Sequence, residues 1–356
     1  LFPYTTLFRS PRAPQPSTDT VVFSAEKAIM SGRSQPAPTG CVSDLSASIH
    51  RRGRDGLPAG RRLSGWAVAL LASLMVQLVT QDARSATAFY PFESDPAWDP
   101  AWQFGDNGTN PRPWSPAGGQ GDGGGFLALS WPVGGLHTAW AMPPLDADRR
   151  IGRFEFSCDV RAGNSSGDRP ADGFSISFAR LDDPVLARLN DPEAFAGGFP
   201  ESGTTTGLSI SFDTWSGNEL PDGPDLEGIA VRVDNRTVYR QPRPLRHGDC
   251  ADSMSLQTGP RDAGFWESGG ADRVFDPESW GSLCWAPLRI QLTDAGQIAV
   301  WWKDRMVVDF MPTGYKPHPG RFVIAARTGG ANQHVHLDNI RVTTSVDTTG
   351  DFVLRL

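Results

Sequence analysis

The stretch GLSISFDTWSGNELPDGPDLEGIAVRVD, residues 207–234, decides the fold of this chain. In its first part Leu208, Ile210 and Phe212 alternate with serines, and apolar residues alternate again in its last part. Such alternation gives a strand one face that can be buried in a core. The stretch therefore predicts two β-strands joined by an acidic loop.

The loop between these strands concentrates oxygen ligands in a segment rich in Gly and Pro. Its oxygen-bearing side chains include Asp213, Asn218, Asp222 and Asp225. Hard oxygens on an irregular loop are what a calcium ion requires. The same residues suit a solvated hairpin loop, and their spacing leaves both interpretations open.

Short strand patterns repeat along the chain on both sides of this stretch. They are predicted at residues 126–131, 153–161, 173–179, 208–212, 229–233, 288–292, 298–302, 306–310, 322–326 and 335–342. Turn residues separate them, and a helical period is nearly absent apart from residues 184–189. The pattern predicts an all-β sandwich or barrel with a substantial core between residues 89 and 345.

The first 88 residues differ from the rest in charge. They carry ten Lys or Arg and five Asp or Glu, a formal +5, whereas the remaining 23 basic and 35 acidic residues give −12. Residues 1–60 show no sustained period and are expected to be an unstructured or artefactual preface. Because the rest is acidic, with no basic patch among its aromatics, nucleic acid is not an expected partner.

Residues 61–88 have the features of a secretory signal peptide. Arg61 and Arg62 precede the apolar run 66–79, and Ala86-Thr87-Ala88 supplies a cleavage site after Ala88. A membrane anchor is the alternative, but about 19 uncharged residues span a bilayer only marginally. We expect a secreted or cell-surface domain, without membrane attachment after cleavage, followed by a tail or linker at residues 346–356.

Three cysteines follow the signal segment. Cys158 shares the parity of buried-face residues in its strand and is expected to be a free thiol. Cys250 and Cys284 flank an irregular Gly- and Pro-rich insertion, so a disulfide between them is predicted in an exported protein. The sequence also permits a disulfide between Cys158 and one of these two cysteines.

Several pieces of the chain, taken in order, resemble the legume-type lectins of the concanavalin A-like lectin and glucanase superfamily, and bacterial secreted relatives in particular. The pieces are Ala171-Asp172-Gly173, the loop with Gly197-Gly198, the acidic loop, FVIAARTGG and VHLDNIRV. The resemblance covers about residues 154–342. It implies a jelly-roll β-sandwich of two antiparallel sheets that binds carbohydrate.

The resemblance also implies a sugar site. In the family the Asp of the Ala-Asp-Gly turn follows a cis peptide and accepts hydrogen bonds from sugar hydroxyls, which corresponds to Asp172. A Gly-rich loop donates backbone N–H groups, which corresponds to Gly197 and Gly198. An Asn with one amide atom toward calcium and the other toward the sugar corresponds to Asn218. A plain Asp-Gly turn and a flexible loop are the alternatives for the first two.

The calcium ligands implied by the resemblance are Asp213, the backbone carbonyl of Trp215, Asn218, and either Asp222 or Asp225. Asn218 stands one residue later than in the family pattern. The Glu and His that bind a transition metal in the family correspond here to Ser211 and to Leu226 or Glu227. Calcium is therefore expected and a transition metal is not.

The sequence offers little for catalysis. The glucanase branch carries Glu-x-Asp-x-Glu on one strand, and this chain lacks it. Glu155 and Asp159 share a strand face, but four residues apart they are about 13 Å from each other. We expect a non-enzymatic lectin-like domain; a glycoside hydrolase of the same fold and a structural module without a sugar site are the alternatives.

Tryptophans provide a second route to sugar binding because a pyranose ring stacks on an indole. The candidates are Trp215, Trp266, Trp280, Trp301 and Trp302. Since adjacent strand residues face opposite ways, one of the last two is expected to lie in the core. His334 and His336 flank Val335 and are interpreted as a polar strand face rather than a metal site.

Overall fold

The computed structural model describes residues 85–121, 123–189, 200–217, 219–220, 223–224, 226–243 and 248–348. All of them belong to the second of the two units into which the chain divides, Gly65–Leu356. Within these residues the fold is a jelly-roll β-sandwich of two antiparallel sheets, as predicted. None of the helices in the described part of the chain has the length and apolar character to cross a membrane.

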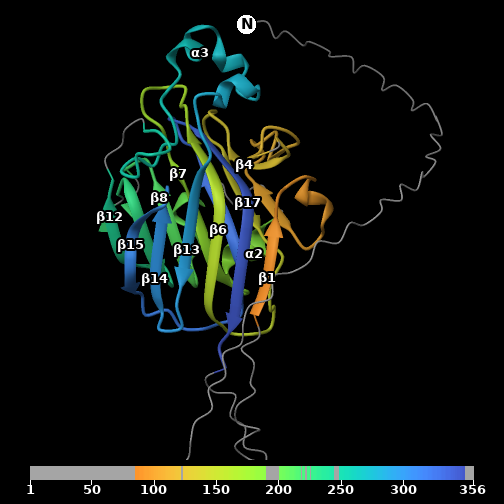
Figure 1. Ribbon diagram of the computed structural model, residues 1–356, viewed down its shortest axis with the longest axis vertical. Coiled ribbons are helices and arrows are strands. Elements are labelled where there is room, and N and C mark those ends of the chain that lie inside the picture. The colour runs from red at the N-terminus through yellow and green to blue at the C-terminus, as the bar shows by residue number, and fades with distance from the viewer. Residues whose placement is uncertain are drawn as a thin grey trace, which may run out of the picture. The chain divides into compact units, whose positions relative to one another are not determined.

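One sheet, which we call the back sheet, faces the viewer in Figure 1. Its strands in order are β15 (Arg305–Pro312), β14 (Gln297–Trp302), β13 (Ala286–Leu292), β6 (Ile151–Gly163), β17 (His334–Val346), β4 (Phe126–Ser130) and β3 (Trp114–Ser115). β1 (Ser85–Tyr90) also pairs with β17. The long β6 and β17 lie side by side along nearly their whole length and form the centre of the sheet.

The other sheet, the front sheet, packs against it on the side away from the viewer. Its order is β12 (Arg236–Pro242), β11 (Gly228–Val233), β8 (Leu208–Asp213), β7 (Gly173–Arg180), β16 (Gly320–Arg327), β5 (His137–Ala141) and β2 (Gln103–Asp106). The two-residue strands β9 (Glu219–Leu220) and β10 (Gly223–Pro224) pair with each other. Strands β8 and β11 are therefore the paired strands expected on either side of the acidic loop.

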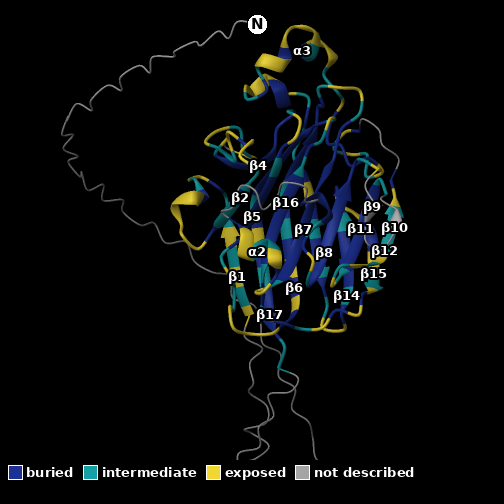
Figure 2. Ribbon diagram, turned by 180° about the vertical axis from the view of Figure 1, so that it is seen from behind, coloured by how far each residue is buried: buried dark blue, intermediate teal, exposed yellow. Residues whose placement is uncertain are grey.

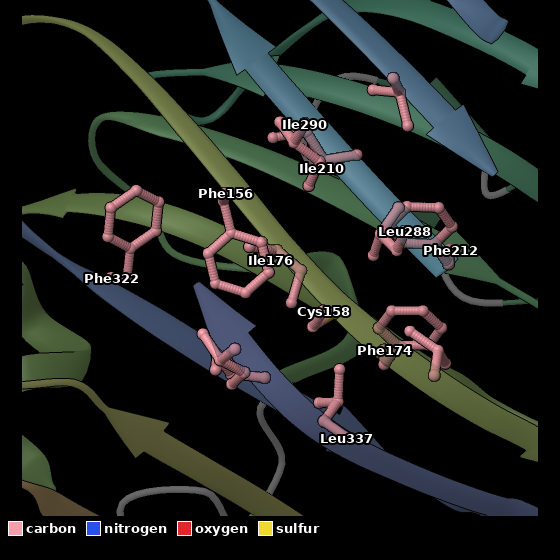
Figure 3. Close-up of a cluster of buried hydrophobic side chains, with 14 of the residues drawn as sticks. Phe156, Cys158, Phe174, Ile176, Ile210, Phe212, Leu288, Ile290, Phe322 and Leu337 are labelled. Atoms are coloured by element: carbon pink, nitrogen blue, oxygen red, sulfur yellow. The ribbon is translucent and has the colours of Figure 1, made fainter. Parts of the chain in front are cut away.

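The core lies between the sheets and follows from the period-two patterns. Phe156 and Leu288 of the back sheet meet Ile176, Ile210 and Phe212 of the front sheet in one buried cluster (Figure 3). Free Cys158 is buried in the same cluster, as its parity predicted. Burial of each large apolar side chain contributes roughly 1.5–3 kcal/mol, so this layer is the main source of stability.

All ten predicted strands are present, and helix α2 (Pro184–Arg188) occurs where a helical segment was expected. Sequence patterns missed β2, β3, β5 and β12 because they are short or, like β12, edge strands with polar residues. They also missed β1, whose first four residues pair with Val342–Ser345 of β17. Cleavage after Ala88 would leave two residues of this strand, and that boundary stays a prediction.

Helix α2 and the described residues from Pro200 onward lie against the outer face of the front sheet, and α2 can be followed in Figure 2. Helix α2 packs Val185 and Leu186 against a cluster that includes Ala139 and Val323. Ser175 on β7 donates a hydrogen bond to the carbonyl of Pro200, in the short helix η3 (Pro200–Ser202), at 2.7 Å. This face is therefore buried.

An insertion at residues 248–285 covers part of the outer face of the back sheet. It contains helix α3 (Ala263–Glu267) and the short helices η4 (Gly270–Asp272) and η5 (Pro277–Trp280). Lys303, in the turn after β14, donates hydrogen bonds to three of its carbonyls, those of Asp249, Asp252 and Gln257. The predicted disulfide between Cys250 and Cys284 is confirmed and closes the base of the insertion.

Loss of this disulfide should lower stability. Because it spans 34 residues of sequence, its removal in a Cys250→Ser, Cys284→Ser variant should cost roughly 3–4 kcal/mol of unfolding free energy. Urea unfolding measures this cost. Reducing agent should lower the midpoint of the unmodified chain by a similar amount and leave the variant unaffected; an unchanged midpoint after reduction would contradict the prediction.

Candidate functional site

Four strands of the front sheet meet at one end in a row of directly opposed residues. Arg327 of β16 pairs with Gly173 of β7, Gly173 with Asp213 of β8, and Asp213 with Gly228 of β11. Gly173 is required because its φ is 133° and a Cβ there would lie 2.3 Å from the carbonyl oxygen of Phe212. The close pairing places Asp172 and Asp213 beside each other at this end.

Asp172 is fixed by its backbone and by an ion pair. The Ala171–Asp172 peptide bond is cis, as the resemblance implied. The Asp172 N–H donates to the carbonyl of Arg327 at 2.9 Å, and its carbonyl accepts from the N–H of Thr214 at 2.8 Å. Its carboxylate is 3.2 Å from Nε of Arg327, and only 3% of the residue is exposed.

Arg327 joins a second buried carboxylate to Asp172. Its guanidinium donates to Oε1 of Glu201, in η3, at 3.0 Å. Burial raises the pKa of Glu201 to about 7, although the charge of Arg327 opposes the shift. No sequence pattern pointed to Glu201, because it enters the site only through the fold of the chain between β7 and β8.

The loop after β16 runs against the Asp172 carboxylate. A Cβ added to Gly329 would lie 3.2 Å from Oδ2 of Asp172. The glycine therefore leaves one side of the carboxylate without a side chain over it. The FVIAARTGG piece contributed to the resemblance, but its glycine was not assigned to the site.

The start of the acidic loop is well defined. Asp213 is buried, and its Oδ1 accepts a hydrogen bond from the N–H of Trp215 at 2.8 Å. The Trp215 ring lies under the guanidinium of Arg169, 4.0 Å from the ring centroid. Arg169 also pairs with Glu227, which accepts a hydrogen bond from Ser216 at 3.1 Å. The Trp215 ring is therefore engaged within the protein, and its backbone lies beside the Asp213 carboxylate.

The other predicted site residues lie outside the described residues. These are Gly197, Gly198, Asn218, Asp222 and Asp225. In the described part of the chain, no group of three or more acidic, His or Cys side chains is arranged to hold a metal ion. Asp213 and the Trp215 backbone present the hard oxygen atoms that calcium prefers, so the residues present suit the ion. The calcium and sugar ligand sets stay predictions.

The tryptophans considered for sugar stacking differ in how far they are buried. Trp302 is fully buried in the core, as expected for one of the adjacent pair, and Trp301 is partly exposed. Trp280, within the insertion, is buried against Trp131 and presents no free indole face for stacking. Trp266 is partly exposed, and its indole N–H donates a hydrogen bond to Asn164. The most exposed described tryptophan, Trp98 at 78%, was not among the candidates.

His334 and His336 share one face of β17, but the prediction of a polar strand face is wrong because the insertion buries both. Nε of Arg161 donates to Nδ1 of His336 at 3.1 Å, and Phe126 and Trp280 pack around the pair. Burial, together with the nearby Arg161 charge, lowers the pKa of His334 to about 3 and that of His336 well below its usual value. Both histidines are therefore neutral in the folded protein.

No family model matches the chain, and no curated protein matches it. Solved structures of similar fold include three sugar-binding or lumenal domains. The VIP36 exoplasmic/lumenal domain in its Ca2+/Man2-bound form is 12% identical, covers 74% of this chain and 90% of its own, and has a TM-score of 0.44. Lectin I-B4 from Griffonia simplicifolia, metal-free, is 16% identical with coverages of 72% and 99% and a TM-score of 0.43. A Bauhinia forficata lectin in complex with GalNAc is 15% identical with coverages of 74% and 100% and a TM-score of 0.42.

Solved lectins are thus among the proteins to which the chain is similar in structure. At these identities and scores the strand order and pairing described above establish the fold. A bacterial origin stays a prediction.

The buried histidines predict acid sensitivity. A His whose folded pKa lies below the unfolded value of about 6.5 stabilises the fold above that pH and loses this contribution as the pH falls toward the folded pKa. At pH 5 the loss from His334 is about 2 kcal/mol, from the shift to a pKa of about 3.

His334→Gln should therefore show a smaller loss of unfolding free energy between pH 7 and pH 5 than the unmodified chain, measured by urea unfolding at each pH. The matched control is His137→Gln, at a partly exposed histidine of β5, which should keep the full pH dependence. Parallel pH profiles for the unmodified chain and His334→Gln would refute this account of His334.

Proposed function

We propose that this chain binds carbohydrate with the help of calcium at the end of the front sheet where β7, β8 and β16 meet. The observation that carries the proposal is the position of Asp172 and Asp213. Asp213 ends β8 and Asp172 directly precedes the neighbouring strand β7, and the hydrogen bond from the N–H of Thr214 to the Asp172 carbonyl connects the acidic loop to the Asp172 turn. An ion held by the loop would stand beside an acceptor for sugar hydroxyls.

Each part has a separate task in this proposal. Asp213 and the Trp215 carbonyl hold calcium together with Asn218 and Asp222 or Asp225, and calcium in turn fixes the loop. Asp172 accepts hydrogen bonds from the sugar, while Gly197, Gly198 and Asn218 donate to it. Arg327 orients the Asp172 carboxylate, against which Gly329 packs with no side chain of its own. Hydrogen bonds to a charged group contribute roughly 1.5–3 kcal/mol each.

The proposal describes a binding protein rather than an enzyme. Asp172 and Glu201, two of the carboxylates at this site, share the guanidinium of Arg327. In a retaining glycosidase two carboxylates instead flank the scissile bond about 5–5.5 Å apart, with the substrate between them. Here Arg327 occupies the position between these two carboxylates, which does not match that arrangement.

One observation favours a second candidate, a secreted or cell-surface structural module without a sugar site. Asp172 is almost wholly buried and already paired with Arg327, so it also serves to attach the β7 turn to β16. A purely structural Asp172 predicts strong destabilisation on mutation and no sugar binding by the unmodified chain. The lectin proposal predicts measurable binding that depends on this carboxylate.

Calcium should raise the melting temperature of the unmodified chain. A ligand that binds only the native state adds about 2.7 kcal/mol at a hundredfold excess over Kd. Asp213→Asn should abolish this rise, whereas Asp309→Asn, at an exposed position of β15, should preserve it. Differential scanning fluorimetry with chelator and with millimolar calcium measures the shift, and equal melting temperatures in the two conditions would exclude calcium assistance.

Sugar binding should depend on both calcium and Asp172. On a glycan array that presents sugars multivalently, the unmodified chain should bind in calcium and lose binding with chelator. Asp172→Asn should weaken the affinity at least about tenfold because a charged acceptor is lost, and Asp309→Asn should not. Binding that survives Asp172→Asn, in a variant shown by circular dichroism to be folded, would move the sugar site elsewhere; no binding by the unmodified chain would favour the structural module.

A further inference from the structure

The outer face of the back sheet carries a hollow of about 640 Å³ away from the candidate sugar site. Residues of the neighbouring strands β14, β13, β6, β17 and β1 line it, and these strands face the viewer in Figure 1. Among the residues that line it are Trp301, Arg289, Ser157, Arg341 and Phe89. We call this hollow the back-sheet groove.

These five residues form one cross-strand row. Trp301 is opposite Arg289, Arg289 is opposite Ser157, Ser157 is opposite Arg341, and Arg341 is opposite Phe89. The row is thus aromatic, Arg, Ser, Arg, aromatic, with the small serine at its centre. Since neighbouring strands are about 4.8 Å apart, the two arginine Cα atoms are separated by about 10 Å.

Each arginine lies over the aromatic ring on its outer side. The Arg289 guanidinium carbon is 3.6 Å from the Trp301 ring centroid, and that of Arg341 is 4.7 Å from the Phe89 ring centroid. Both side chains therefore lean away from Ser157 and leave a slot above it. Stacking on a ring also holds each guanidinium plane in place, which lowers the entropy cost of binding a ligand.

The donors of both arginines are largely unused. Within the described residues Arg341 makes no ion pair or side-chain hydrogen bond, and the carboxylate paired with Arg289 is that of Glu155, at 4.0 Å. Each guanidinium has five N–H donors in a planar fork that suits a carboxylate. The slot is thus flanked by two fixed cations whose donors can reach a negatively charged group.

Acceptors at the edge of the groove restrict the kind of anion. Asp159 and Asp304 line the hollow, and Asp159 accepts a hydrogen bond from Asn339 at 2.9 Å. The positive charges of the two arginines are balanced by the negative charges of the two aspartates. A ligand with many negative charges and few hydroxyls, such as a nucleic acid backbone, is therefore disfavoured. A ligand with one carboxylate and several hydroxyls matches both the arginines and the acceptors.

We propose that the back-sheet groove binds a uronic acid residue of an acidic saccharide. Its carboxylate lies above Ser157 between Arg289 and Arg341, and its hydroxyls donate to Asp159. The site needs neither Asp172 nor Asp213 and no calcium. It lies on the opposite sheet from the site described above and is independent of the function proposed for that site.

A chain of sugars suits the surroundings better than a single one. Phe89 also lines a second hollow of about 380 Å³ that contains Trp98, together with Glu93, Asp95 and Asp99. Trp98 is 78% exposed, which offers an indole face for a pyranose ring with carboxylate acceptors around it. The next sugars of a bound oligosaccharide would extend over Phe89 toward this tryptophan.

The test is calorimetric titration of the full chain, with chelator present throughout, using a glucuronate-containing tetrasaccharide. The comparison ligand is the same tetrasaccharide with its carboxylates reduced to alcohols. The unmodified chain should bind the acidic form at least about tenfold more tightly than the reduced form. Arg289→Gln and Arg341→Gln should each weaken binding of the acidic form at least about tenfold.

Two further variants distinguish binding in the back-sheet groove from a general effect of the protein's charge. Arg153→Gln removes the same charge from the same face of β6, four residues from Ser157, and should leave binding unchanged. Ser157→Leu changes no charge but fills the slot, and should abolish binding while circular dichroism stays that of the unmodified chain. Equal affinity for both tetrasaccharides, retained binding in Arg289→Gln with Arg341→Gln, or no binding at millimolar ligand would each overturn the proposal.

Chelator removes calcium and so prevents binding at a calcium-dependent site. The titration in chelator is therefore independent of the binding results for the Asp172 and Asp213 variants. Calcium-dependent binding of neutral sugars without chelator-resistant uronate binding would support the function proposed above and reject the groove. The reverse result would reject the calcium-assisted site and support the groove.

Discussion

The candidate site depends on one guanidinium that pairs with two buried carboxylates. Arg327 ends β16 and is held between the carboxylates of Asp172 and Glu201, which come from the turn before β7 and from the chain before β8. Loss of the guanidinium would leave these carboxylates buried without a partner, and breaking a buried pair in this way costs roughly 3–5 kcal/mol. The requirement for charge compensation therefore fixes three separate segments at one end of the front sheet.

This arrangement explains why the front sheet offers a site at its end and not on its face. The outer face of β7 and β8 carries small residues, and there Ser175 donates a hydrogen bond to the carbonyl of Pro200 in η3 and Ser177 donates one to Ser209. A ligand on this part of the face would have to displace these contacts. The row Arg327, Gly173, Asp213 and Gly228 is where the strands end and the loops begin, so the polar groups collect there.

The outer face of the back sheet is divided between two environments. At one part the insertion buries Arg161, His334 and His336 among aromatic rings, and burial keeps both histidines neutral. The adjoining part is open, and there Arg289 and Arg341 lie over Trp301 and Phe89 at the surface. The same combination of arginine and aromatic rings is thus packing in one place and, in our proposal, a binding surface in the other. The difference is whether another segment of the chain covers it.

The sequence by itself determined the strands, because alternation such as that of Leu208, Ile210 and Phe212 is a local consequence of the period of a β-strand. Strand parity also predicted the burial of Cys158, and the cysteines that flank the insertion indicated the disulfide, although a bridge to Cys158 stayed open until the fold was known. Only the tertiary structure decided which side chains meet. Glu201 reaches Arg327 across 126 residues of sequence, and Arg289 and Arg341 lie on either side of Ser157 through the strand order β13, β6, β17. Exposure was decided in the same way: His334 and His336 have the pattern of a polar strand face and become buried because the insertion packs over them. Local periodicity specifies the face on which a side chain lies, whereas contacts between distant segments decide what covers that face.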